Sequence, residues 1–218
     1  MKRLFIIVEG QTEELFVEEV IRPYFWSLGL YDVTPVKIQT SKGFKGGFVS
    51  YQHLRKNALI LLNETNTIVT TLVDFYRIPK SLPNYDSCMR NKSATEKVEC
   101  LEKSMSDDIG LQNRFFPYVQ LHEFEALLFS SSIGFDVYFN SDVTEAVHQV
   151  QLQFDNPEDI NEGAETAPSK RLMRIISDYE KVNHGNIIAL QIGIHKIMEK
   201  CPRFKDWIEK LIKTLKIN

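Results

Sequence analysis

The sequence is poor in cysteine, in long apolar runs and in excess positive charge, and each shortage excludes a class of protein. The three cysteines, Cys88, Cys100 and Cys201, form no CxxC pair, so we expect free thiols in a reducing compartment rather than a disulfide framework or a zinc site. The apolar run Leu4–Val8 is shorter than the roughly seven residues that a signal peptide needs. No other run is long enough to span a bilayer, and we expect a cytoplasmic protein without a membrane segment.

The charge balance does not by itself indicate a nucleic-acid partner. Lys and Arg number 26 against 29 Asp and Glu, which gives a net charge of −3. A strongly basic chain would have indicated nucleic-acid binding from charge alone. Mild acidity does not exclude a nucleic-acid enzyme, however, because bound divalent cations neutralise clustered carboxylates.

Short apolar runs alternate with amphipathic stretches along the first 140 residues. We predict strands at 4–8, 33–39, 67–73 and 116–121 and helices at 12–22, 51–63, 93–105 and 123–129. Pro23 is expected to kink or end the first helix. This alternation favours an α/β fold with a mostly parallel, four-stranded sheet flanked by helices.

The rest of the chain is predicted to be mainly helical. We divide the chain into an α/β core, residues 1–140, and a helical extension, residues 141–218, packed on the core as one unit. The acidic stretch 142–165 contains no Lys or Arg and is expected to be a solvated surface or a flexible link. A helix is expected to begin at Pro168, because proline suits the first helical positions.

Acidic side chains follow three of the predicted strands. Glu9 and Glu13 follow the first strand, Asp74 ends the third, and Glu123 and Glu125 follow the fourth. The carboxyl ends of parallel strands meet at one edge of a sheet, where ligands bind. Converging carboxylates repel one another unless a cation joins them, and hard oxygen ligands suit Mg²⁺ or Mn²⁺, as one ion or as a two-metal site. Each residue taken singly is equally typical of a helix start or a turn.

Several basic residues suit a phosphate-bearing substrate. Lys170 and Arg171 stand at a helix start, where positive charge is unfavourable, and Lys170 is suited to stabilise charge on a phosphoryl group. Lys42 and Lys45 lie in a glycine-rich loop that lacks the P-loop pattern; with Arg171 they are candidates to guide a phosphate backbone, or they are merely exposed. His122 is a candidate to orient a carboxylate or contact phosphate, or it is a buried or capping histidine.

Five blocks of the sequence resemble the signature blocks of a bacterial Toprim-related family, the domain of unknown function family 4276. They run through almost the whole chain: VEGQTEE at Val8–Glu14, VDFY at Val73–Tyr76, LHEFEALLFS at Leu121–Ser130, APSKRL at Ala167–Leu172 and CPRFKDW at Cys201–Trp207.

The resemblance implies a Toprim-like fold and the chemistry of the Toprim nucleases of overcoming-lysogenisation-type and abortive-infection phage-defence systems. On that basis Glu9, Glu13 and Asp74 match metal-binding positions, a later Glu matches Glu123 or Glu125, and the catalytic Lys matches Lys170. The resemblance also implies an ABC-type or AAA-type ATPase partner. The sequence departs from the pattern at its DxD motif, where Tyr76 replaces the second Asp.

These observations lead us to expect a Mg²⁺- or Mn²⁺-dependent endonuclease acting on DNA or RNA. Two alternatives stay open: a catalytically inactive Toprim fold that binds a partner, which Tyr76 favours, and a nucleotidyl-transfer enzyme that uses the same metal site. The sequence does not distinguish DNA from RNA substrates, transfer RNA included, and it leaves homo-oligomer formation open.

Overall fold

The computed structural model describes residues 2–38, 48, 50–161, 163 and 165–217. Its sheet is built from strands that are joined only by parallel pairings in this part of the chain. The order is β2-β1-β3-β4, with β5 also paired to β3. The strands are β1 (Arg3–Val8), β2 (Val33–Lys37), β3 (Thr67–Asp74), β4 (Phe115–Phe116) and β5 (Val119–Gln120). The predicted parallel α/β sheet flanked by helices is confirmed.

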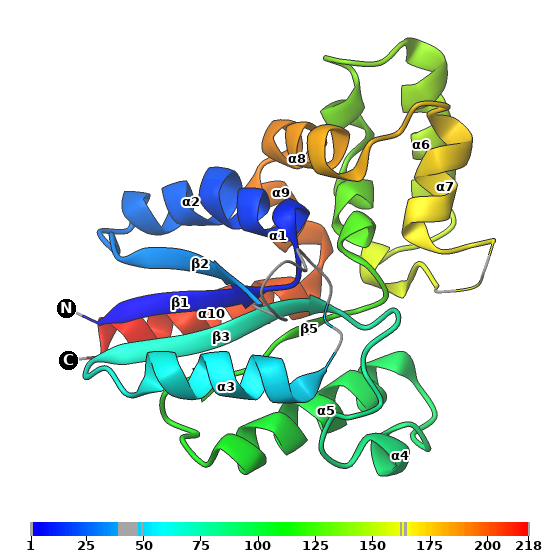
Figure 1. The fold of residues 1–218 in the computed structure, drawn as a ribbon. Helices are drawn as coiled ribbons and strands as arrows, with labels where there is room; N and C mark the ends of the chain where they lie inside the picture. Colours follow the sequence, from blue (N-terminus) through cyan, green and yellow to red (C-terminus); the bar gives the residue numbers. More distant parts are fainter. Residues whose placement is uncertain (1, 39–47, 49, 162, 164, 218) are drawn as a thin grey trace.

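Helices cover both faces of this sheet, and Figure 1 shows the two layers. One side carries α3 (Tyr51–Leu62), α4 (Tyr85–Cys88) and α5 (Ala94–Ile109); the other carries α1 (Gln11–Phe16), α2 (Arg22–Ser27), α8 (Lys181–Ile192), α9 (Ile194–Lys200) and α10 (Pro202–Lys216). The alternation of β1 explains this arrangement: Leu4, Ile6 and Val8 enter one hydrophobic core, whereas Phe5 and Ile7 enter the other.

The first helix does not end at Pro23. A π-helical turn, Val17–Ile21, stands directly before α2, which then continues to Ser27. Proline lacks an N–H and crowds the carbonyl one turn earlier, and a widened turn relieves both conflicts. Of the two expected effects of Pro23, an end of the helix is therefore wrong, and a kink stays a prediction.

The predicted fourth strand, 116–121, is split into β4 and β5 at Pro117, which has no N–H to give to a ladder. Thr71 of β3 fills the gap: its hydroxyl accepts from Tyr118 N (2.9 Å) and donates to Tyr118 O (2.7 Å). The hydrogen bonding along this edge of the sheet therefore continues past Pro117.

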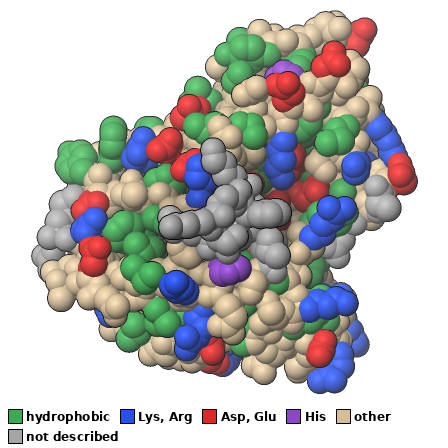
Figure 2. All heavy atoms as spheres, viewed as in Figure 1, with side chains coloured by type: hydrophobic (Ala, Val, Ile, Leu, Met, Phe, Trp, Pro, Cys, Tyr) green, Lys and Arg blue, Asp and Glu red, His purple; other side chains and the backbone are tan. Residues whose placement is uncertain are grey.

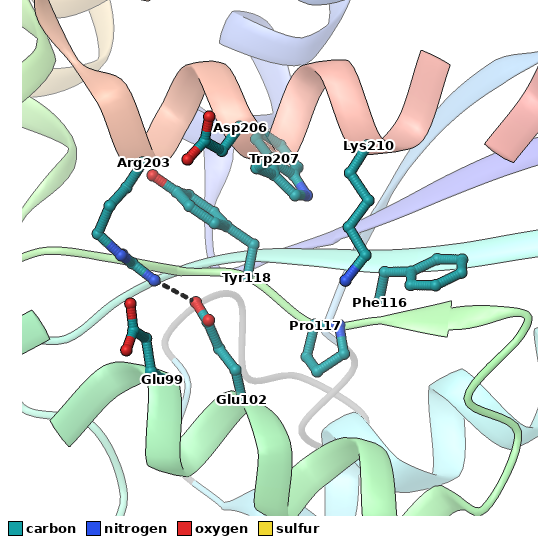
Figure 3. A pocket seen from close by; sticks show the side chains of 9 residues that line it. All are labelled: Glu99, Glu102, Phe116, Pro117, Tyr118, Arg203, Asp206, Trp207 and Lys210. Carbon is teal, nitrogen blue, oxygen red and sulfur yellow. Dashed lines mark hydrogen bonds and ion pairs between the residues drawn. The ribbon is translucent and has the colours of Figure 1, made fainter. Parts of the chain in front are cut away.

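An ion pair covers the outer side of β5. Glu102 Oε1 accepts from Val119 N (2.8 Å), Arg203 Nη1 donates to Val119 O (3.1 Å), and the two side chains pair at 2.8 Å. Figure 3 shows this pair at the floor of a groove between α5 and α10. None of the predicted site residues lines this groove.

The helix expected at 123–129 forms as a 3-10 helix, Phe124–Ser130. The extension then contains α6 (Ser141–Gln151) and α7 (Pro168–Ile175), with short 3-10 turns at Ser132–Phe135 and Pro157–Asp159. One core cluster holds side chains from both spans, such as Phe16 and Phe204. The boundary at residue 140 stays a prediction.

One expectation from composition is wrong, and another holds with one exception. Cys88 and Cys100 form a disulfide between α4 and α5, whereas Cys201 is a buried free thiol. Within the acidic stretch 142–165, most of the described acidic residues are exposed, as expected of a solvated surface, but Glu158 is fully buried. It accepts from Arg203 N (2.9 Å) and Phe204 N (3.2 Å) and thus caps the start of α10. In the part of the chain that the structure describes, no helix is both long and apolar enough to cross a membrane.

Candidate active site

Glu9 and Glu13 stand at the carboxyl end of β1. Val8, the last residue of β1, pairs with Leu72 of β3, so Glu9 lies beside the end of β3. Burial raises the pKa of Glu9, and the Asp74 backbone is among the nearby groups that partly lower it, which places the Glu9 carboxyl near Asp74. Glu13, in the first turn of α1, returns toward the strand end, where its Oε2 accepts from Gly10 N at 2.9 Å.

Asp74 ends β3 and joins it to the segment after β5. Its Oδ1 accepts from Phe124 N at 2.8 Å, and its Oδ2 lies 3.6 Å from Lys181 Nζ. Nearby, Tyr76 N donates to His122 O at 2.8 Å. His122 has the left-handed φ of +61°, which turns the chain into the 3-10 helix. These bonds hold the segment that begins at His122 against the end of β3.

Glu125 completes the set from a third part of the chain. It is fully buried, and its Oε2 lies 3.1 Å from Lys181 Nζ. Neither carboxylate oxygen accepts a hydrogen bond from the described residues. The ion pair with Lys181 is therefore the contact that offsets the cost of burying this charge, and the carboxylate oxygens are suited to accept a metal cation as well.

The electrostatics are consistent with one shared site. Burial raises the pKa of Asp74 well above its ordinary value; Lys181 offsets part of this shift, and the nearby Glu13, Glu9 and Glu125 add to it. Burial, followed by the charge of Glu13, likewise raises the pKa of Glu9. The cluster therefore holds more negative charge than Lys181 balances.

Lys181, the first residue of α8, was missed by the sequence analysis. Burial alone would lower its pKa, but the surrounding carboxylates, Asp74 and Glu125 foremost, raise it. A signal was present in the sequence: a lysine at a helix start opposes the helix dipole. The same argument had selected Lys170 and applies equally to Lys181.

The other predicted residues contact other parts of the described chain. Glu123 is buried, and its Oε2 accepts from Ser169 N at 2.9 Å. Lys170 is exposed in the first turn of α7. Arg171 donates from Nε to Thr166 O at 2.9 Å and lies over the Phe154 ring at 5.2 Å.

The predicted phosphate contacts Lys42 and Lys45 lie outside the described residues. On the face drawn in Figure 2, Lys and Arg side chains are spread among acidic and apolar ones. Guidance of a phosphate backbone by the glycine-rich loop therefore stays a prediction.

The donor set fits a hard divalent cation in its chemistry. Glu9, Glu13, Asp74 and Glu125 offer only carboxylate oxygens, the ligands that Mg²⁺ and Mn²⁺ prefer. Among the described residues, no three side chains of Asp, Glu, His or Cys lie close enough together to hold an ion as they stand. Binding would therefore require side chains to turn inward, away from the contacts with Gly10 and Lys181.

A parallel β2-β1-β3-β4 sheet between two helical layers, with carboxylates at the ends of β1 and β3, defines a Toprim-like α/β domain. Within that class, residues 8–212 match the model of the Domain of unknown function (DUF4276), and the chain belongs to this family.

Two solved structures are similar to this fold. The C-terminal region of the Burkholderia pseudomallei OLD protein is 14% identical, with a TM-score of 0.53 over 99% of this chain and 97% of that one. The C-terminal region of the Xanthomonas campestris pv. campestris OLD protein is 16% identical, with a TM-score of 0.44 over 96% of this chain and 95% of that one. At these identities the first likeness shows the fold alone, and the second adds no argument. No curated protein matches the sequence.

Proposed function

We propose that this protein is a Mg²⁺- or Mn²⁺-dependent nuclease that hydrolyses phosphodiester bonds of DNA or RNA. The observation that carries the proposal is the convergence of Glu9, Asp74 and Glu125, from three separate segments, around Lys181. The likeness of the fold to the C-terminal region of the Burkholderia pseudomallei OLD protein supports a Toprim-like nuclease domain.

Each residue receives a role from its place in the cluster. Glu9, Glu13, Asp74 and Glu125 would hold one or two cations, with the oxygens of Glu125 still without hydrogen bonds. When bound, such an ion would polarise the phosphoryl group and acidify a water molecule. A carboxylate that is released from the ion is suited to accept the proton of the attacking water.

Two lysines are suited to the substrate. Lys181 lies within the carboxylate cluster and would stabilise the negative charge that develops on the phosphoryl group. Lys170 is exposed at the start of α7 and would contact a phosphate of the bound strand, together with Arg171. Binding through these contacts should weaken with salt.

The biological setting is part of the same proposal. The family blocks that suggested an ATPase partner support a role as the effector of an ATPase-coupled, cytoplasmic anti-phage system. The helical extension offers surface for such a partner or for a second copy of the chain.

Tyr76 favours one competing function, a Toprim fold without catalysis. Its backbone N–H supports the His122 turn, and its ring lies under the Arg77 guanidinium at 5.1 Å. The side chain thus supplies an aromatic surface where a carboxylate would supply charge. This alternative predicts that the protein binds its partner yet cleaves nothing.

A cleavage assay with supercoiled plasmid, single-stranded DNA, messenger RNA and transfer RNA separates these functions. We expect cleavage of at least one substrate with Mn²⁺ or Mg²⁺ and none with EDTA. Asp74→Asn should lower the rate by on the order of 100-fold or more, since it removes a cation ligand. Glu14→Gln is the matched control, because Glu14 pairs with Lys37 outside the cluster.

The outcomes distinguish the three functions. Cleavage that is unaffected by Asp74→Asn would remove this site from the reaction. The absence of cleavage by wild-type protein with its ATPase partner present would favour the inactive fold. Incorporation of labelled nucleotide instead of release of fragments would indicate nucleotidyl transfer.

A further inference from the structure

The two glutamates of the 122–125 segment, Glu123 and Glu125, contact different parts of the protein. Glu125 lies 3.1 Å from Lys181 within the cluster, whereas the Glu123 carboxylate accepts from Ser169 N at the start of α7. Both side chains are buried. The two carboxylates therefore bind different elements, although one residue separates them.

The start of α7 needs an acceptor that its own sequence does not provide. Pro168 stands among its first residues, and Ala167, which precedes the helix, has no side-chain oxygen to cap it. The first turn also carries Lys170 and Arg171, whose positive charges oppose the helix dipole. A carboxylate from another part of the chain corrects both defects, since it accepts the free Ser169 N–H and adds negative charge.

Glu123 is held in this orientation on both sides. The next peptide N–H, that of Phe124, is bonded to Asp74 Oδ1 at 2.8 Å. On the α7 side, Arg171 is fixed by Thr166 O and the Phe154 ring. Rotation of Glu123 toward the cluster would thus leave the buried Ser169 N–H without its partner.

We propose that Glu123 is a positioning residue that caps α7 and so fixes the helical turn that carries Lys170, while Glu125 is the glutamate of this segment that binds the cation. The proposal rests on the proposed function for the reaction that Lys170 serves. The contact between Glu123 and Ser169 joins the family blocks at 121–130 and 167–172, which are far apart in sequence.

Hydrogen exchange and Mn²⁺ calorimetry test the cap without any need for cleavage. Glu123→Ala should speed exchange of the amides of residues 169–172 by on the order of tenfold, the range that a capping bond supports. Glu123→Gln keeps an acceptor oxygen and should stay near the wild-type exchange rate. Both variants should bind Mn²⁺ within about twofold of wild type, whereas Glu125→Gln should bind it at least about tenfold more weakly.

Kinetics test whether the cap acts through Lys170. Glu123→Ala should lower kcat by about tenfold, Glu123→Gln should restore most of it, and Glu123→Ala should add little in a Lys170→Ala background. Multiplicative losses in the double variant would show that Glu123 does not act through Lys170.

Two results would overturn the proposal. A tenfold or greater loss of Mn²⁺ affinity in Glu123→Gln would make Glu123 a ligand, and unchanged exchange in Glu123→Ala would show that it is not a cap. If Glu123→Ala does not fold, the Mn²⁺ affinities of Glu123→Gln and Glu125→Gln still show which of the two glutamates binds the cation. If the wild-type protein cleaves no substrate, the proposed function fails, while exchange and calorimetry still distinguish cap from ligand.

Discussion

Neutralising Glu125 should stabilise the metal-free protein and reduce the gain in stability that bound Mn²⁺ gives. Glu125 is fully buried, and its oxygens accept no hydrogen bond from the described residues. A neutral amide at this place loses the ion pair with Lys181, but Lys181 keeps Asp74 at 3.6 Å. We expect Glu125→Gln in EDTA to gain about 1 kcal/mol, because it removes one negative charge from a buried cluster whose carboxylates outnumber Lys181 and repel one another. That gain corresponds to a rise in Tm of about 2–4 °C for a chain of this size.

The stabilisation that Mn²⁺ gives should be smaller in Glu125→Gln than in the wild-type protein. Mn²⁺ at 100 times its Kd stabilises a folded protein by about 2.7 kcal/mol. A tenfold loss of affinity in Glu125→Gln would reduce this gain to about 1.4 kcal/mol at the same concentration. Differential scanning calorimetry with EDTA and with Mn²⁺ measures both effects.

Glu158→Gln is the matched control for a buried carboxylate outside the cluster. Because Glu158 accepts from Arg203 N and Phe204 N, the variant should lose about 1–3 kcal/mol and keep the full response to Mn²⁺. If Glu125→Gln destabilises the metal-free protein and responds to Mn²⁺ as wild type does, our reasoning about this site is refuted.

Three further predictions concern Lys181, the disulfide and Glu102. Lys181→Met should destabilise the metal-free protein by about 1–2 kcal/mol in urea unfolding, a modest value because the lysine side chain is 37% exposed; no loss would mean that the carboxylates do not depend on it. Reduction of the Cys88–Cys100 disulfide should lower the free energy of unfolding by about 3 kcal/mol for its separation of 12 residues, and a Cys88→Ser variant should then be insensitive to reductant. Burial raises the pKa of Glu102 although Arg203 opposes the shift, so its contribution to stability is present below the ordinary pKa of 4.5 and is lost as the pH rises through the raised value. Glu102→Gln should therefore flatten the decline of stability above that pH, and an unchanged slope in urea titrations would contradict the assignment.

Features set by local sequence were predictable. The Ser93–Glu96 capping box forms as expected, with Ser93 Oγ accepting from Glu96 N at 3.1 Å, because both partners lie in one helical turn. The strand that ends at Asp74 was predictable from its run of β-branched residues, and its parallel pairing places Glu9 beside it.

Features set by long-range contacts were not predictable from the same patterns. In an α-helix, His122 and Glu125 would share a face. The 3-10 helix that forms begins only at Phe124, and Glu123 before it and Glu125 within it bind different elements. Similarly, Lys181 enters the cluster only because α8 packs against α1 in three dimensions. The sequence spacing alone does not contain this information.

The position of a bound ion tests the central claim most directly. Crystals soaked in Mn²⁺ and measured for anomalous scattering should show a peak about 2.2 Å from oxygens of Asp74 and of at least two of Glu9, Glu13 and Glu125. A Mn²⁺ peak elsewhere, with these carboxylates still directed at Lys181 and Gly10, would contradict the account.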